Sequence, residues 1–291
     1  MGAFFYKLAA FLVNRLPLKL SYWLAECLGG FYYLFALSSR RIVRNNLLHL
    51  FNGNIGRDEL RFYIKRTFRE FSKYLVELFF FPSLNKENID RFISIENLHY
   101  VDELLKFGKG IIVLAAHFGN WEMGGITMGL KGYPMNALVL DHRNKSVNNF
   151  FVNRRESKGE RNIPLGFAIR RCFEALRQNE ILAVLGDREF NRLKKGIKIN
   201  FCGRETRPCI PKGAAKLAIK TGAKIIPAFV VREKNNRLRL VFKEPLEVNY
   251  NGNEEEDVRR IMEDFFAIFE KMLKKNPAQW FIFHPLWEEI D

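Results

Sequence analysis

Cysteine is scarce in this sequence, with four residues in 291: Cys27, Cys172, Cys202 and Cys209. No C-x-x-C pair occurs, and no cysteine stands at a metal-ligand spacing from a histidine. Zinc motifs and disulfide frameworks both depend on such regular spacings. The sequence therefore excludes the common cysteine-based metal motifs and predicts free thiols in a reducing compartment, with no bound metal.

The N-terminal region lacks both a clear signal peptide and a long, uncharged apolar run. No small-residue cleavage site follows the first apolar run, residues 3–13. Residues 20–37 are apolar apart from Glu26, and the next charged residues are Arg40, Arg41 and Arg44. Eighteen residues with one carboxylate are marginal for crossing a bilayer, and the arginines would keep that end in the cytoplasm. Residues 1–38 are therefore expected to form a membrane anchor, as one spanning helix or a pair of interfacial helices; a buried helical hairpin is the third alternative.

Acidic residues are few relative to basic ones. The sequence has 47 Lys and Arg against 32 Asp and Glu, a formal net charge of +15 at pH 7. Such a field favours anionic partners, either nucleic acid or a phospholipid surface. The 28 phenylalanines, many of them beside Lys or Arg in the first 80 residues, suit a membrane interface better than a duplex groove. We therefore expect contact with membrane lipids and not with nucleic acid.

Helical patterns fill the first 80 residues, and short apolar runs follow from about residue 90. Apolar residues at spacings of three and four, with basic residues between them, indicate an amphipathic helix over residues 57–81. The later apolar runs lie at residues 111–116, 137–140, 181–185, 224–231 and 238–242. Runs without polar alternation are typical of strands buried on both faces. The sequence therefore predicts an α/β fold, a mixed and partly parallel sheet flanked by helices, behind a helical membrane-associating N-terminus.

One domain is expected after the N-terminal segment, over residues 39–291, because no low-complexity linker or internal repeat interrupts it. Two of its helices have recognisable ends. Residues 212–221 form a helix that Gly222 ends, and Asn253 caps a last helix that reaches about residue 275.

Titratable side chains directly follow three of the predicted strands. His117 follows the first, Arg143 lies in the polar stretch after the second, and Asp187 follows the third. In open α/β sheets, ligands bind outside the carboxyl ends of the strands. We therefore expect these residues to share one edge of the sheet and to form a functional site there.

His117 is the best candidate for the chemistry. Gly119 permits a tight strand-to-helix turn after it, and Glu122 in the first helical turn can fold back toward the imidazole. A carboxylate on one ring nitrogen fixes the tautomer and leaves the other nitrogen as a general base. No serine or cysteine nucleophile stands in this segment, which favours direct transfer to an acceptor hydroxyl. The alternative, a histidine buried for packing, explains neither the strand-end position nor the nearby glutamate.

Arginines are frequent between the first and third strand ends. Arg143, Arg154 and Arg155 are candidates to hold phosphate groups of a donor or acceptor, because arginine binds phosphate bidentately. Arg154 and Arg155 are expected in a polar loop. Asp187 is expected to orient one of these arginines or to accept a hydrogen bond from an acceptor sugar.

Several segments, in order, resemble one protein family. His117, four residues and Glu122 resemble the H-x4-D/E signature of glycerolipid and lipid A acyltransferases, and HFGNWE is similar to the version in lipid A late acyltransferases. Further segments resemble the family's R-x-N-L, L-x-D, F-x-G and T-G-A-x-I-x-P patterns: residues 44–47, 185–187, 201–203 and 221–227. The resemblance covers about residues 40 to 285.

The resemblance implies transfer of a fatty acyl chain from acyl carrier protein or coenzyme A to a hydroxyl of a lipid A precursor. The resemblance also implies that the reaction takes place at the cytoplasmic face of the bacterial inner membrane and needs no cofactor. His117 would be the base and Glu122 its partner. The candidate substrate-binding residues are Asn120, Arg143, Arg154, Arg155 and Asp187.

Two positions depart from the family's pattern. Arg188 stands where the family usually has glutamine, and Pro285 follows His284 where basic residues are usual. Both positions bear on the acceptor, so one alternative is the same transfer to another glycolipid, an aminolipid, a lysophospholipid or a phosphatidylinositol mannoside. A second alternative is a basic protein without catalysis that binds membranes or nucleic acid.

Overall fold

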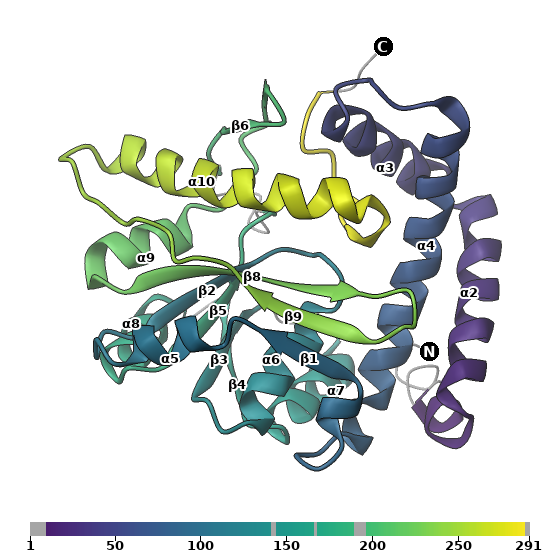
Figure 1. Ribbon diagram of the computed structural model, residues 1–291, viewed down its shortest axis with the longest axis horizontal. Coiled ribbons are helices and arrows are strands. Elements are labelled where there is room, and N and C mark those ends of the chain that lie inside the picture. The colour runs from purple at the N-terminus through teal and green to yellow at the C-terminus, as the bar shows by residue number, and fades with distance from the viewer. Residues whose placement is uncertain (1–9, 141–143, 166–167, 189–195, 289–291) are drawn as a thin grey trace.

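The computed structural model describes residues 10–140, 144–165, 168–188 and 196–288 (Figure 1). The first part of the chain is helical, and strands alternate with helices after it. The N-terminal helices are α2 (Leu18–Phe35), α3 (Leu37–Leu50) and α4 (Arg57–Phe80). The expected domain boundary after residue 38 falls in the first turn of α3 and remains a prediction. The four cysteines are free, as expected.

Within the described residues, seven strands form one sheet in the order β1-β9-β8-β2-β5-β3-β4. The strands are β1 (Ile93–Glu96), β2 (Ile111–Ala115), β3 (Met135–Val139), β4 (Glu160–Pro164), β5 (Ile181–Leu185), β8 (Lys224–Arg232) and β9 (Leu238–Phe242). Neighbouring strands run parallel except β8 and β9. A separate two-stranded hairpin joins β6 (Asn200–Phe201) to β7 (Arg204–Glu205). The predicted α/β class, with a mixed and partly parallel sheet, is confirmed.

Helices cover both faces of the sheet, which explains the apolar runs without alternation. They are α5 (His99–Leu105), α6 (Trp121–Leu130), α7 (Lys145–Glu156), α8 (Ala168–Arg177), α9 (Gly213–Thr221) and α10 (Glu254–Lys275). On β2, Ile112 and Leu114 belong to the core shared with α8, α9 and α10, and Ile111 and Val113 to the core shared with α5 and α6. Figure 1 shows α9 and α10 on one side of the sheet, α6 and α7 on the other, and α4 with α2 across one end.

Helix α2 packs along α4 and turns a broad apolar face outward. Its outward side chains are between 57% and 69% exposed: Trp23, Leu28, Phe31, Tyr32, Leu34 and Phe35. None of the described helices has the length and apolar character to cross a membrane. The helices expected near the N-terminus are present.

The turn between β2 and α6 is held tightly from two sides. The Gly119 N–H donates to the carbonyl of Gln279 over 2.8 Å, and the Phe281 N–H donates to the carbonyl of His117 over 2.7 Å. Gly119 has a φ of 59°. A Cβ there would lie 1.6 Å from the carbonyl oxygen of Val230 on β8. Only glycine fits this turn.

Gly119→Ala is expected to lower the free energy of unfolding by about 3 kcal/mol or more, because a backbone clash adds to left-handed strain. Gly132→Ala is the matched control. Gly132 also has a positive φ, 90°, but no heavy atom lies within 4 Å of its Cβ position. Denaturant unfolding of both variants compares the losses. Equal losses would contradict the close approach of β8 at Gly119.

Candidate active site

His117 and Asp187 meet because their strands are parallel neighbours in equal register. Ala115 of β2 lies opposite Leu185 of β5, and each site residue stands two positions further on. Asp187 Oδ1 lies 2.7 Å from His117 Nδ1, and Oδ2 accepts the His117 backbone N–H over 3.0 Å. The Trp280 indole N–H also donates to Oδ2, over 3.2 Å. One carboxylate thus fixes both the backbone and the ring of His117.

The Asp187 carboxylate is ionised and fully buried. Burial alone would raise its pKa, but nearby His117 and the hydrogen bonds from His117 and Trp280 hold the pKa below its ordinary value. An ionised carboxylate only accepts hydrogen bonds, so the proton of a neutral imidazole sits on Nδ1. Nε2 is then the basic nitrogen of the ring. The arrangement is chemically able to remove a proton from a hydroxyl.

Glu122 occupies a different place from the one expected. Its carboxylate binds Arg155 bidentately, with Nε–Oε2 at 2.6 Å and Nη2–Oε1 at 2.7 Å, and Arg155 Nη1 donates to Asn162 over 3.1 Å. Burial alone would lower the pKa of Arg155, but Glu122 raises it above its usual range. Asp187 therefore supplies the carboxylate that was expected from Glu122 at the imidazole, while Glu122 fixes the position of an arginine.

The predicted arginines do not all lie where the sequence placed them. Arg154 and Arg155 lie on α7, not in the polar loop expected for them. Arg154 packs over the ring of Phe150 on its own helix, with Cζ 3.2 Å from the ring centroid, and donates to the Phe150 carbonyl. Arg143 lies outside the described residues. Arg155 is thus the predicted arginine that the structure places beside Glu122.

Asn120 caps α6 and is fully buried. Its Oδ1 accepts the Met123 N–H over 2.9 Å, and its Nδ2 donates to Glu77 Oε2 of α4 over 2.6 Å. An N-cap of this kind fixes the start of a helix. Asn120 therefore positions the helix that carries Glu122, and its contact with a substrate remains a prediction.

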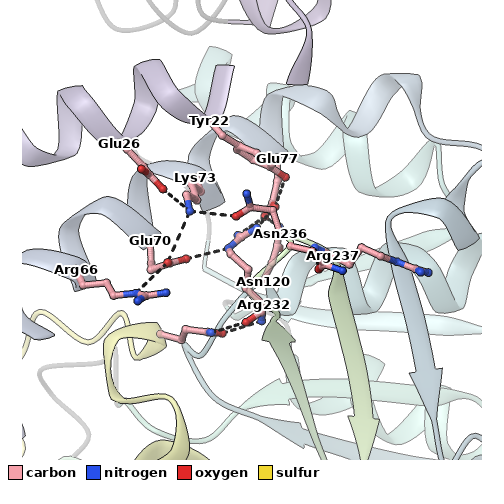
Figure 2. Close-up of polar contacts among 12 residues, drawn as sticks. Tyr22, Glu26, Arg66, Glu70, Lys73, Glu77, Asn120, Arg232, Asn236 and Arg237 are labelled. Atoms are coloured by element: carbon pink, nitrogen blue, oxygen red, sulfur yellow. Dashed lines mark hydrogen bonds and ion pairs between the residues drawn. The ribbon is translucent and has the colours of Figure 1, made fainter. Parts of the chain in front are cut away.

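The position of Asn120 is fixed by a buried network of ion pairs and hydrogen bonds (Figure 2). Arg232 of β8 donates to Glu77 over 2.8 Å and pairs with Glu70 at 3.0 Å. The Tyr22 hydroxyl of α2 donates to Glu77 over 2.6 Å. Lys73 of α4 bonds Glu26 of α2 and also the side chain of Asn236. The network joins α2, α4, the start of α6 and the end of β8.

A cavity of about 1220 Å³ opens beside His117. Its polar lining includes His117, Glu122, Arg155, Glu160 and Arg188, and four further basic residues: Arg170, Lys212, Lys216 and Lys220. Its apolar lining includes Val113, Met128, Met135, Leu240 and Phe242. Pockets for drug-sized ligands measure roughly 300–1,000 Å³, so this cavity has room for a longer apolar chain.

Comparison with known proteins identifies the family of this chain. Residues 1–289 match the family described as bacterial lipid A biosynthesis acyltransferase. The chain belongs to this family. It is therefore an acyltransferase, and its reaction requires an acyl donor and a lipid acceptor.

Individual relatives are similar over most of their length. Phosphatidylinositol mannoside acyltransferases from two Mycobacterium tuberculosis strains are each 27% identical over 227 residues, 76% of this chain and 69% of theirs. The enzyme of the same name from Mycolicibacterium smegmatis is 26% identical over 228 residues, 77% of this chain and 72% of its own.

Several residues of this site have no signal in the sequence that would identify them. Trp280 lies in an aromatic segment, and no local pattern indicates that its indole N–H donates to Asp187. Glu77 and Arg232 resemble ordinary surface charges in the sequence, and nothing in their local pattern indicates burial. Glu160 is missed because the short strand β4 is not predicted.

Arg232→Met is expected to lower the free energy of unfolding by about 3–5 kcal/mol, because two buried glutamates lose their arginine. Arg239 is the matched control on the neighbouring strand β9. It also pairs with two glutamates, Glu96 and Glu233, but its side chain is 37% exposed. Arg239→Met should cost less than about 1 kcal/mol. Similar losses for both variants would show that burial of the network contributes little.

Proposed function

We propose that the protein transfers a fatty acyl chain from a thioester to a hydroxyl of a glycolipid, with His117 as the general base. The observation that supports this most is the His117–Asp187 pair at a cavity with a long apolar lining. Asp187 holds Nδ1, so Nε2 takes the acceptor's proton.

The reaction proposed is a direct transfer. As Nε2 removes the hydroxyl proton, the hydroxyl oxygen attacks the thioester carbonyl and a tetrahedral oxyanion forms. The carbon–sulfur bond then breaks, and the thiolate takes the proton back from the imidazolium. Asp187 stabilises the imidazolium between the two proton transfers. No covalent acyl-enzyme is needed.

Of the cavity arginines Arg155 and Arg188, Arg188 is proposed to bind an anionic group of a substrate. The charge of Arg155 is already neutralised by Glu122, so this pair mainly forms a rigid polar part of the cavity lining. Arg188 follows Asp187 directly and lines the same cavity. Burial lowers its pKa and Asp187 raises it in part. We propose that Arg188 contacts a phosphate of the acceptor or of the donor's pantetheine arm.

The acceptor proposed is a sugar hydroxyl on a lipid anchor. The family's description supports a lipid A precursor, and the mycobacterial relatives support a phosphatidylinositol mannoside. Both are glycolipids with acylatable hydroxyls. The donor is an acyl thioester of acyl carrier protein or coenzyme A. Turnover of each acceptor with each donor, followed by mass spectrometry of the lipid product, distinguishes these pairings.

The outward apolar face of α2 is proposed to lie in the cytoplasmic face of the bacterial inner membrane. Six large apolar side chains of α2 are more than half exposed, and Arg40 and Arg41 follow the helix. Aromatic and basic residues together favour an anionic lipid interface. A glycolipid acceptor would then reach the site without leaving the bilayer surface.

His117→Ala is expected to reduce acyl transfer by roughly 10²–10⁴-fold, because the general base is lost. His99→Ala is the control, since His99 is an exposed histidine on α5. Transfer of a radiolabelled acyl chain to a glycolipid measures both rates, and vesicle binding should stay unchanged in both variants. Transfer by His117→Ala at the rate of His99→Ala would refute the proposed base.

The triple variant Trp23→Ser, Phe31→Ser and Phe35→Ser is expected to bind anionic phospholipid vesicles at least about tenfold more weakly, because each serine removes about 1.5–3 kcal/mol of apolar transfer energy. Phe107→Ser is the control, an equally exposed phenylalanine beyond the end of α5. Vesicle sedimentation measures the binding of the triple variant and of Phe107→Ser. Unchanged binding of the triple variant would exclude this face as the membrane contact.

A further inference from the structure

Glu160 is a buried carboxyl in the cavity that the proposed reaction does not use. It is the first residue of β4, is 3% exposed and lines the cavity. Helix α6 makes room for it at Gly125, where a Cβ would lie 2.7 Å from Glu160 Oε2. Gly125 is three residues after Glu122, so Glu160 lies about one helical turn further along α6 than the Glu122–Arg155 pair.

The Glu160 carboxyl has unused hydrogen-bonding capacity. Its Oε2 is buried and has no hydrogen-bond partner in the part of the chain that the structure describes. The charges that act on Glu160 are those of Glu122 and Arg155, but these two side chains are bound to each other, and Arg155 also donates to Asn162. Leaving a buried polar atom unpaired costs roughly 1–3 kcal/mol. A partner at this position would recover that energy.

The surroundings of Glu160 favour the protonated, neutral form of its carboxyl. Burial and repulsion from Glu122 raise the pKa of Glu160 to about 8, although Arg155 opposes the shift. A protonated carboxyl both donates and accepts hydrogen bonds. A cationic ligand group would lie beside Arg155 and gain little from a neutral acid, so a neutral hydroxyl is the better partner.

Along α6, Glu160 lies where the cavity lining changes from polar to apolar. On one side are His117, Glu122 and Arg155; on the other are Met128, one turn further along α6, and Met135, which pairs with Glu160 between β3 and β4. If His117 works at the thioester, as proposed above, the acyl chain runs from the polar end to the apolar end. A chain on this path passes the Glu160 carboxyl.

We propose that Glu160 selects acyl chains that carry a hydroxyl, by hydrogen bonding to that hydroxyl inside the cavity. This inference rests on the proposed acyl transfer and names the class of acyl donor. Sites built to hydrogen-bond a hydroxyl discriminate strongly against analogues that lack it. Glu160 is thus a specificity residue, separate from the base and its partner.

The test compares acyl-coenzyme A donors of equal chain length, plain or with a single hydroxyl at successive carbons. The wild type should show a kcat/KM at least about tenfold higher for one hydroxylated donor, a difference of about 1.4 kcal/mol. Glu160→Leu should lose or reverse that preference, whereas Glu160→Gln, which can still donate and accept, should keep most of it. Glu156→Leu, an exposed glutamate of α7, is the control and should behave as the wild type.

The proposal is overturned if the wild type prefers plain chains at every hydroxyl position, or if Glu160→Leu keeps the wild-type preference. A second readout does not need turnover: the rise in unfolding temperature on adding free hydroxylated or plain fatty acid. Hydroxylated fatty acid should stabilise the wild type more than Glu160→Leu, and equal stabilisation counts against the proposal. If no donor is transferred but this difference persists, the acyl-transfer proposal fails and the hydroxyl site stands.

The neutral state of Glu160 has its own check. Between the ordinary glutamate pKa of about 4.5 and the raised value of about 8, the folded protein keeps a proton that the unfolded chain has lost. The free energy of unfolding of the wild type, relative to Glu160→Gln, should therefore fall as pH rises through this window and level off above it. A difference that stays flat from pH 5 to 8 would show an ionised Glu160 and would contradict its role as a donor.

Discussion

The Asp187 carboxylate is the interaction on which the site depends. It is fully buried and accepts hydrogen bonds from the His117 backbone, the His117 ring and the Trp280 indole. These donors come from the end of β2 and from the C-terminal segment, so one anion ties three parts of the chain together. Removing a donor would leave a buried charge poorly paired, which is strongly destabilising. Folding at this edge of the sheet and orientation of the imidazole are therefore a single requirement.

The second set of buried charges extends this requirement to the N-terminal helices. Glu77 accepts hydrogen bonds from Arg232 of the sheet, Tyr22 of α2 and Asn120 at the start of α6. The helix with the outward apolar face is therefore connected, through one glutamate, to the residue that caps the active-site helix. A membrane contact on α2 and the geometry at His117 are linked by hydrogen bonds that water does not reach, which keeps them strong.

Much of this organisation can be predicted from the sequence, for reasons visible in particular residues. The apolar run at 111–116 identifies a strand buried on both faces, and Gly119 identifies a turn that excludes a Cβ. Asn253 identifies the start of α10, where its Oδ1 accepts two backbone N–H groups. Local patterns do not show which strands are neighbours, so the pairing of His117 with Asp187 in place of Glu122 could not be predicted. The strands β1 and β4 were missed because they are short and half polar, and the buried charges of Glu77, Glu160 and Arg232 have no local signature.

A double-mutant cycle measures whether Asp187 acts through His117. The single-turnover rate of acyl transfer is measured for the wild type, His117→Ala, Asp187→Asn and the double variant. If the two residues work as one unit, Asp187→Asn slows the wild type markedly but changes the rate of His117→Ala very little, as in other catalytic pairs. Losses that multiply in the double variant would show that Asp187 contributes independently of the imidazole and would contradict the account.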